Sequence, residues 1–297
     1  MTLLVVGEAL VEFYRPARDV PLDRPGEMVG PFPSGAPAIF ASVAARLGVP
    51  TELCSVVGDD PFGRLLVERL SKDGVDVCGV RVDPERTTAT AFVAYSSNGE
   101  RTFVFHVRDS AAGRLRLEDL GDRPERCEWL HVSGSAVALG ASLGATAVEA
   151  VRRAKAAGAR VSVDPNLRPE VGAPDVRVTI AAMIEQADVV FPSEGELRAL
   201  GLDEDRLVSG GVSVLTTLGP KGARVRGLDV DVLVPAPEVR EVDPTGAGDT
   251  FAAGFVAARL KGFDPASAVR LGCERAARSV ETIGPMESTV EPMVLSS

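Results

Sequence analysis

One stretch of the chain decides how the rest is interpreted, namely Asp243-Pro-Thr-Gly-Ala-Gly-Asp249-Thr-Phe-Ala-Ala-Gly-Phe255. Gly246 and Gly248 carry no side chain, so the backbone around them can turn sharply and bring its N–H groups close to a ligand. The alanine-rich segment that follows is typical of a helix, whose first N–H groups and positive dipole end point at the same place. The turn is therefore predicted to bind an anion.

The carboxylate of Asp249 lies inside this predicted anion site, where it would repel a bound phosphate. A role in accepting the proton of an attacking hydroxyl would explain its presence. The alternative is that Asp249 or Thr250 only caps the helix after a glycine-rich turn. The flanking residues favour the catalytic interpretation over the cap.

The composition limits the classes of protein that fit. The chain has 297 residues, 45% of them hydrophobic and 25% charged, which suits one large α/β domain and excludes a disordered or fibrous protein. The formal net charge of −10 argues against a nucleic-acid or membrane partner, because both require a basic surface. A phosphate ligand would then depend on local amides, a few cations and a metal ion.

The cysteines and the first residues bear on the compartment. Leu3-Leu-Val-Val-Gly7 resembles a strand and lacks the features of a secretory signal, and no apolar run approaches the ~20 residues of a membrane span. We therefore expect a cytoplasmic protein. The cysteines are far apart and show no zinc spacing, so we expect reduced core thiols at Cys54, Cys78, Cys127 and Cys273.

Short apolar runs alternate with amphipathic segments, a pattern typical of a parallel sheet covered by helices. Helices are predicted around Phe62–Leu70, ending at Gly74, and over Leu143–Ala157, ending at Gly158. Buried strands are predicted at Leu3–Val6, Leu53–Val57, Trp129–Ser133, Arg160–Val163, Val189–Phe191 and Val212–Thr217.

Two segments interrupt this alternation. Arg86–Val107 contains β-prone stretches around Asn98-Gly99, a strong signal for a hairpin. With Glu12–Phe32 it is expected to form a small separate sheet. Such a sheet could act as a lid that excludes water from phosphoryl transfer, or it could be an ordinary surface hairpin.

Further motifs line up with the turn at 243–255 in the chain order Gly7-Glu-Ala-Leu-Val-Glu12-Phe, Asp164-Pro-Asn-Leu-Arg-Pro169, Pro192-Ser-Glu-Gly-Glu196 and Thr217-Leu-Gly-Pro-Lys-Gly222. Together they resemble the PfkB (ribokinase-like) family of carbohydrate kinases over essentially the whole chain. The absence of G-x-x-x-x-G-K-[ST] excludes a P-loop kinase.

The resemblance implies a ribokinase-like three-layer α/β/α sandwich with a mainly parallel central sheet and a small β-sheet lid. It implies a single domain over residues 1–297, with a core at 1–11, 33–85 and 109–297 and a lid at 12–32 and 86–108. The lid sheets of such proteins often pair, so a homodimer through the lid is expected.

The resemblance also assigns roles at the phosphoryl end. Gly246, Ala247 and Gly248 would form the anion hole, and Asp249 would be the catalytic base. ATP and Mg²⁺ are the implied cofactors. The loop at Asp243, together with the region near the C-terminus, would hold a monovalent cation such as K⁺, although packing alone also explains that region.

The nucleotide-binding turn of the family is similar to Thr217–Gly222. Thr217, Gly219, Lys221 and Gly222 would then meet ATP, with the glycines allowing close approach of the backbone; the alternative is an ordinary hairpin turn. Glu196 matches a glutamate that organises Mg²⁺ and phosphate indirectly. Because Ser-x-x-Glu is also the capping-box pattern, Ser193 and Glu196 could instead start a helix.

The substrate side departs more from the family. Arg168 and Arg108 would orient a substrate carboxylate or phosphate, since a guanidinium makes two parallel hydrogen bonds to such groups. Glu12 and Gly35 match substrate-contacting positions. His106 stands where 2-keto-3-deoxygluconate kinases have tyrosine, and taken alone it suits a half-buried strand residue.

Two further substitutions make the substrate pocket atypical. Ser34 replaces a glycine, and Ile39 replaces an asparagine that hydrogen-bonds sugar hydroxyls in the family. A buried polar contact of that kind contributes ~1 kcal/mol or more, so its loss changes the substrate range.

The leading functional hypothesis is ATP-dependent, Mg²⁺-requiring phosphorylation of a sugar or sugar acid at a primary hydroxyl. The similarity is greatest to 2-keto-3-deoxygluconate kinase, then fructokinase, with nucleoside and hydroxymethylpyrimidine kinases further away. A non-catalytic sugar or nucleotide sensor is the rival from another class, although a sensor has no need of Asp249. A dehydrogenase would need G-x-G-x-x-G after the first strand, which this chain lacks.

Overall fold

A computed structural model describes residues 3–97, 101–167, 175–227 and 230–288. Within these residues one sheet runs through the centre, in the order β13-β12-β11-β10-β9-β8-β1-β4-β5. Strands β5 to β11 of this order are parallel, and β12 and β13 are antiparallel additions at one edge. The strands are β1 (Leu3–Val6), β4 (Thr51–Gly58), β5 (Val80–Asp83), β8 (Trp129–Ser133), β9 (Arg160–Asp164), β10 (Val189–Val190), β11 (Ser213–Thr217), β12 (Ala223–Gly227) and β13 (Val230–Val234).

Every predicted core strand is present. The strand predicted at Leu3–Val6 is β1 itself, and none of its side chains is exposed to solvent. Continuous burial of this kind arises because helices cover both faces of a parallel sheet. The apolar runs were therefore a sound guide to the centre of the fold.

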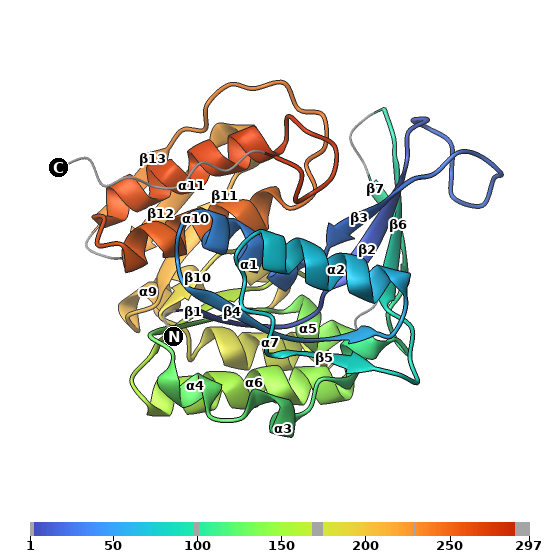
Figure 1. The fold of residues 1–297 in the computed structure, drawn as a ribbon. Helices are drawn as coiled ribbons and strands as arrows, with labels where there is room; N and C mark the ends of the chain where they lie inside the picture. Colours follow the sequence, from blue (N-terminus) through green and yellow to red (C-terminus); the bar gives the residue numbers. More distant parts are fainter. Residues whose placement is uncertain (1–2, 98–100, 168–174, 228–229, 289–297) are drawn as a thin grey trace.

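Helices lie on both faces of this sheet, so the three-layer α/β/α sandwich is confirmed (Figure 1). One face carries α1 (Ala36–Arg46), α2 (Pro61–Lys72), α10 (Ala247–Leu260) and α11 (Pro265–Ser279). The other carries α3 (Leu117–Leu120), α4 (Arg123–Arg126), α5 (Ser135–Leu139), α6 (Ala141–Ala156), α7 (Val176–Ile184), α8 (Glu196–Ala199) and α9 (Glu204–Ser209). Two short 3₁₀ turns are η1 (Ala111–Arg114) and η2 (Gly219–Lys221).

Close packing fixes helix α10, which follows the glycine-rich turn. A Cβ atom on Gly254 would lie 3.1 Å from the Cα of Gly272, so α10 and α11 approach through their glycines. The next residue, Phe255, meets Phe191 edge-on at 5.7 Å between ring centroids. Phe40 of α1 stacks on the buried His131 of β8 at 3.7 Å. Helices α1 and α10 are therefore packed closely within this layer.

A second sheet stands beside the sandwich, in the order β3-β2-β6-β7 (Figure 1). Its strands are β2 (Leu10–Arg15), β3 (Val29–Ser34), β6 (Ala89–Tyr95) and β7 (Arg101–His106). The predicted hairpin is confirmed as β6 and β7, which pair from Thr90 with His106 to Tyr95 with Arg101, whereas Asn98-Gly99 lies outside the described residues. This sheet is called the lid below.

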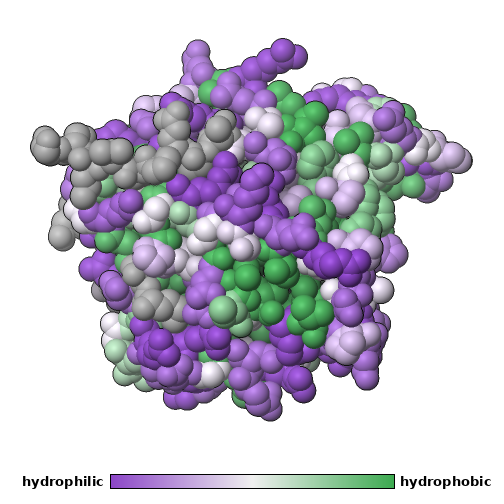
Figure 2. Space-filling model, viewed as in Figure 1, coloured by the Kyte–Doolittle hydropathy of each residue, from purple (hydrophilic) through white to green (hydrophobic). Residues whose placement is uncertain are grey.

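Exposed side chains and thiols complete the description. Hydrophilic side chains cover much of the face in Figure 2, with hydrophobic areas between them. No helix in the described ranges is long and apolar enough to cross a lipid bilayer. All four cysteines are free, and three are buried, but Cys78 is exposed, so the prediction of a core thiol was wrong there. Cys78 follows α2 in a surface connection and not in a strand.

Candidate active site

A cavity lies between the lid and the carboxyl ends of the central strands. Parallel strands end at a common edge, and ligands of open α/β sheets bind at that edge. The core side of the cavity includes Glu8, Gly35, Ile39, Ser135, Leu139, Asn166, Thr245, Gly246 and Asp249. The lid side includes Leu10, Glu12, Ser34, Ala91, Arg101, Phe103 and Phe105.

The glycine-rich turn forms one end of this cavity. Gly246 has φ +79°, a left-handed conformation that favours glycine, and it is the N-cap of α10. Helix α10 begins at Ala247, so its first N–H groups lie beside the cavity, where they can bind an anion. Asp249 sits in the first turn of this helix and is 9% exposed. The alternative that Asp249 or Thr250 caps the helix is wrong, because Gly246 occupies that position.

Ile39 closes the cavity beside this turn with an apolar wall. A Cβ atom on Gly246 would lie 3.2 Å from both Cδ1 and Cγ2 of Ile39 and 3.1 Å from Cβ of Pro285. Glycine is therefore favoured at position 246 for two reasons: the backbone is left-handed there, and neighbouring side chains approach closely. Ile39 is 2% exposed and presents only hydrocarbon to a ligand.

Asp243 acts as a hydrogen-bond acceptor beneath the turn. Its Oδ1 accepts from the Tyr95 hydroxyl at 2.7 Å and from the N–H of Thr245 at 3.0 Å. Its Oδ2 accepts from the N–H of Gly284 at 2.9 Å. This carboxylate therefore ties the lid, the turn and the C-terminal segment together.

Two acidic residues near the start of the chain line the cavity, Glu8 in the turn after β1 and Glu12 in β2. Glu8 accepts a hydrogen bond from Ser135 at 2.6 Å, and both it and Glu12 are buried. Gly35 has φ +102°, and a Cβ atom there would lie 2.8 Å from the carbonyl oxygen of Glu8. Glycine at this position therefore lets α1 start close against the Glu8 backbone. The structure brings Glu12 and Gly35 to the cavity, as predicted.

The lid residues that reach the cavity differ from those predicted. Side chains alternate between the two faces of a strand, and Arg101, Phe103 and Phe105 of β7 face the cavity. His106 has the opposite parity; it is exposed and lies edge-on to Phe92 at 5.8 Å. Arg108, beyond the strand end, is exposed as well and is not among the residues that line the cavity. The structure therefore does not bring His106 and Arg108 to this cavity, and the lid arginine that lines it is Arg101.

Glu196 joins two strand ends. Its Oε1 accepts from the N–H of Leu167 at 2.9 Å, and its Oε2 accepts from the N–H of Ser193 at 2.7 Å. The predicted capping box is only half present, because α8 starts at Glu196 itself with Gly195, at φ +88°, as its N-cap. Glu196 is thus a residue that fixes the loops after β9 and β10.

The loop after β9 carries Asn166, whose side chain donates to Ser133 Oγ at 3.1 Å. Its N–H donates to Asp164 at 2.9 Å, and its φ of +38° turns the chain toward the cavity. Asn166 lines the cavity, whereas Arg168, the predicted substrate contact two residues later, lies outside the described residues.

The predicted nucleotide turn is a β11–β12 hairpin that contains η2. Thr217 donates its N–H to the carbonyl of Pro192 at 2.9 Å, and Lys221 is exposed. A Cβ atom on Gly222 would lie 2.0 Å from the carbonyl oxygen of Val234, so this glycine lets the end of β13 approach the turn. Gly219, at φ +59°, has nothing within 4 Å of that position. The contact of these glycines with ATP stays a prediction.

With this geometry in place, the sequence model of the pfkB family carbohydrate kinases matches residues 2–292. The chain belongs to the pfkB family of carbohydrate kinases. A fructokinase of Vibrio alginolyticus is 36% identical over 264 residues, which are 85% of this chain and 82% of that one. A structure named ribokinase II from E. coli, in complex with ATP and Mg²⁺, is 36% identical with a TM-score of 0.90 and covers 98% of this chain and 96% of that one.

A second solved relative is a fructokinase of Vibrio cholerae O395 with fructose, ADP and a calcium ion bound. It is 30% identical, has a TM-score of 0.85 and covers 97% of this chain and 95% of that one. A double mutant of the same fructokinase holds fructose, ADP and a potassium ion. The curated relatives of this pfkB kinase thus include fructokinases, and they support the fructokinase alternative better than the expected likeness to 2-keto-3-deoxygluconate kinase.

Several cavity residues of this kinase were not predicted from the sequence. The spacing of Arg101, Phe103 and Phe105 was a usable signal, because side chains two residues apart lie on the same face of a strand. Glu8 and Asn166 lie within the motifs at residues 7–13 and 164–169, but no pattern singled out either side chain, and Ser135 lies in no motif. The Glu8–Ser135 bond joins residues 127 positions apart, so only the fold brings them together.

Proposed function

We propose that this carbohydrate kinase transfers the γ-phosphoryl group of ATP to a primary hydroxyl of a neutral ketohexose of the fructose type. The observation that carries the proposal is one cavity lined by Asp249, Gly246 and Glu12. It combines a carboxylate, a helix N-terminus and a sugar-facing acid within a single space. Fructokinases at 36% identity support the fructose class for the acceptor.

Each group has a definite task in the transfer. The substrate hydroxyl oxygen attacks the γ-phosphorus, its proton passes to Asp249, and the bond to the β–γ bridging oxygen breaks to release ADP. The N–H groups of Ala247, Gly248 and the residues after them stabilise the charge on the transferring group. In a loose transition state the base acts late, so an ordinary carboxylate is adequate as the base.

The described residues suit a Mg²⁺ ion that arrives bound to ATP. The described residues contain no cluster of three or more histidine, cysteine or acidic side chains that could hold a metal. Mg²⁺ commonly binds through substrate phosphates with one or two carboxylates and water, so ATP would bring it. Glu196 would act on it only indirectly, since both of its oxygens accept backbone N–H groups. The Asp243 loop stays a predicted K⁺ site.

The charge of the cavity favours a neutral substrate. Its described lining includes the carboxylates of Glu8, Glu12 and Asp249 and one cation, Arg101. A substrate carboxylate would lie among buried acids and be repelled by them, whereas hydroxyl groups can donate to those acids. The wall at Ile39 suits a carbon face of the sugar and not a hydroxyl.

A sugar acid is the second candidate, and Arg101 is the observation that favours it. Its side chain reaches the cavity from β7, next to Phe103, over whose ring its guanidinium lies at 5.6 Å. A guanidinium in this position could pair with a carboxylate of a 2-keto-3-deoxy sugar acid. This role would replace the one first predicted for Arg108.

The test measures ADP formation from ATP with a panel of fructose, other hexoses and 2-keto-3-deoxygluconate. We expect the highest kcat/KM for fructose. A higher value for the sugar acid would support the second candidate, particularly if Arg101→Met removes that preference and Arg108→Met does not. Binding of sugar and nucleotide without turnover would indicate a sensor. Assembly as a homodimer through the lid stays a prediction, which light scattering can check.

A further inference from the structure

Tyr95 connects the lid to the glycine-rich turn. It is the last residue of β6 and pairs across the hairpin with Arg101. Its ring has the same strand parity as Ala91, which lines the cavity, so it lies on the inner side of the lid. The side chain is buried at 9% exposure and does not itself line the cavity.

The hydroxyl of Tyr95 completes a small ring of hydrogen bonds. It donates to Oδ1 of Asp243 at 2.7 Å, since an ionised carboxylate can only accept. Its oxygen then accepts from the hydroxyl of Thr245 at 2.9 Å, because the phenol has a single proton. The N–H of Thr245 donates back to the same Asp243 oxygen at 3.0 Å. Thr245 is therefore held by both its backbone and its side chain.

This ring is adjacent to the predicted anion hole. Thr245 lines the cavity and immediately precedes Gly246, the N-cap of α10. Burial and the neighbouring Asp243 carboxylate raise the pKa of Tyr95, so the phenol keeps its proton and remains a donor. A phenylalanine here would leave a buried carboxylate short of a donor and a threonine hydroxyl short of an acceptor.

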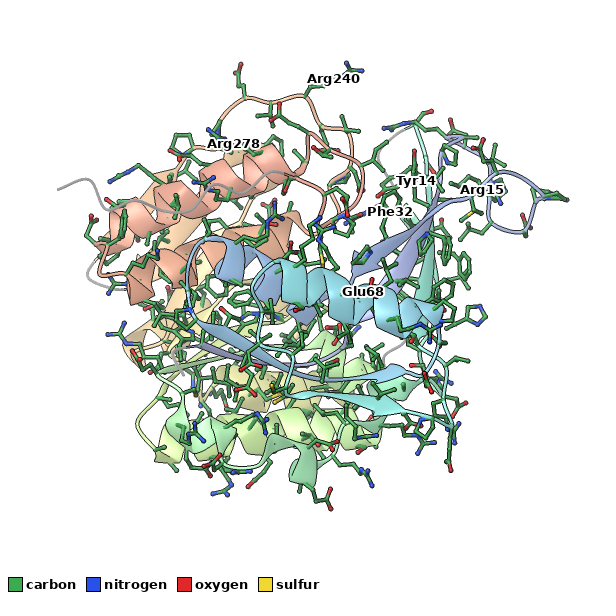
Figure 3. All side chains as sticks on the ribbon, in the orientation of Figure 1. Tyr14, Arg15, Phe32, Glu68, Arg240 and Arg278 are labelled. Atoms are coloured by element: carbon green, nitrogen blue, oxygen red, sulfur yellow. The ribbon has the colours of Figure 1, made fainter. Side chains whose placement is uncertain are left out.

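The segment around Gly284, near the C-terminus, also contacts Asp243, through the second carboxylate oxygen. Gly284 donates to Asp243 at 2.9 Å, and a Cβ atom on Gly284 would lie 2.7 Å from the ring of Phe32 in β3. Tyr14 and Phe32 are labelled in Figure 3 on the lid strands, where their rings lie 6.4 Å apart. Arg46 of α1 donates to the carbonyl of Met286 at 3.1 Å, so the core holds this segment in turn.

We infer that Tyr95 is a positioning residue for phosphoryl transfer, whose hydroxyl sets the Asp243–Thr245 turn and thereby the N–H groups at the start of α10. The inference rests on the proposed function, in which those N–H groups bind the transferring phosphoryl group. It makes a lid residue outside the cavity necessary for the rate of the chemical step and not for sugar binding.

The experiment compares Tyr95→Phe with Tyr14→Phe. Both variants lose one phenolic hydroxyl from the lid, and the half-exposed Tyr14 packs edge-on against Tyr95 at 6.3 Å. We expect Tyr95→Phe to lower kcat with ATP and fructose at least tenfold while the sugar KM changes less than twofold. We expect Tyr14→Phe to change neither. A Tyr95→Phe enzyme with wild-type kcat, or with the loss confined to KM, overturns the inference.

A double-mutant cycle with Thr245→Val separates positioning from general damage. If Tyr95 acts through the turn, Thr245→Val alone lowers kcat similarly, and the double variant loses no more than the larger single effect. If the kcat loss of the double variant were the product of the two single losses, the inference would be contradicted. If Tyr95→Phe does not fold, the kcat of Thr245→Val alone tests the inference. Asp249→Ala is the control for the function: if it retains turnover, the proposed mechanism fails, whereas a dead Asp249→Ala beside an unaffected Tyr95→Phe refutes only the role of Tyr95.

Discussion

The phosphoryl end and the sugar end of the candidate active site are constructed differently. At the phosphoryl end, residues 243–249 are consecutive, their backbone adopts a left-handed turn at Gly246, and Asp243 accepts three hydrogen bonds. At the sugar end, the lining comes from β7, from α1 and from loops after several strands. The residues of the first end come from one short motif, which the lid and the C-terminal segment hold in place through Asp243, whereas the second end depends on which face of each element turns inward. A short motif can therefore locate the chemistry while the identity of the acceptor stays open.

The largest effect is expected at the phosphoryl end, for Gly246→Ala. The alanine would have to adopt φ +79°, and its Cβ would lie 3.1–3.2 Å from Pro285 and Ile39. We expect the resulting strain to displace the start of α10. Losing well-placed donors to a developing anion lowers kcat by ~10²-fold or more. Steady-state kinetics with ATP and fructose measures it. Gly262→Ala, at φ +86° with nothing within 4 Å, carries backbone strain alone and should keep kcat near wild type.

A smaller effect is expected at the sugar end. Arg101→Met should raise the sugar KM about tenfold, because one charged hydrogen bond contributes ~1.5–3 kcal/mol and this arginine lines the cavity. Arg108→Met is the matched control, an exposed arginine seven residues further on, and should leave KM unchanged. The reverse pattern would mean that the lid adopts another register during catalysis.

The smallest effect is expected for the pH dependence of stability, through the buried His131 of β8. Burial lowers the pKa of His131 from 6.5 to about 3, so the unfolded chain takes up a proton near pH 6.5 while the folded chain stays neutral. The free energy of unfolding should therefore fall as the pH drops below about 6.5 toward 3. Between pH 7.5 and 5.5 this loss should be about 1 kcal/mol.

Urea unfolding of wild type and His131→Asn at both pH values isolates this contribution from that of the carboxylates. The wild type should lose about 1 kcal/mol more than the variant over this range. His106→Asn, which removes the exposed second histidine, should keep the wild-type dependence. Equal pH dependence in wild type and His131→Asn would contradict a neutral buried imidazole.

The sequence predicted what depends on local pattern. Strand β1 follows from a continuous apolar run, and the turn at Gly246 follows from glycines next to an alanine-rich helix. Both signals lie within a few residues, so the sequence shows them without knowledge of distant contacts. The order of the motifs along the chain was sufficient to indicate the carbohydrate kinase family, which the family match confirms.

What depends on distant contacts could not be predicted. Gly222 belongs to a turn whose sequence resembles a nucleotide-binding turn. The place that a Cβ atom would occupy there is filled by the carbonyl of Val234, in a strand that follows later. The alternative of a helix started by Ser193 and Glu196 is met only in part, because Glu196 accepts from the N–H of Ser193 while Gly195 is the N-cap and the other carboxylate oxygen accepts from Leu167. Tyr95 reaches Asp243 across 148 positions, a contact that no local pattern announces.

The assignment of Asp249 as the catalytic base is tested most directly by comparing wild type with Asp249→Asn. This variant keeps the size of the side chain and loses the base. Calorimetry should show that fructose and a non-hydrolysable ATP analogue still bind with affinities near those of wild type. ADP formation with ATP and fructose should fall by ~10²–10⁴-fold, the usual contribution of a positioned general base. Turnover within a few-fold of wild type in Asp249→Asn would contradict the assignment of Asp249 as the catalytic base.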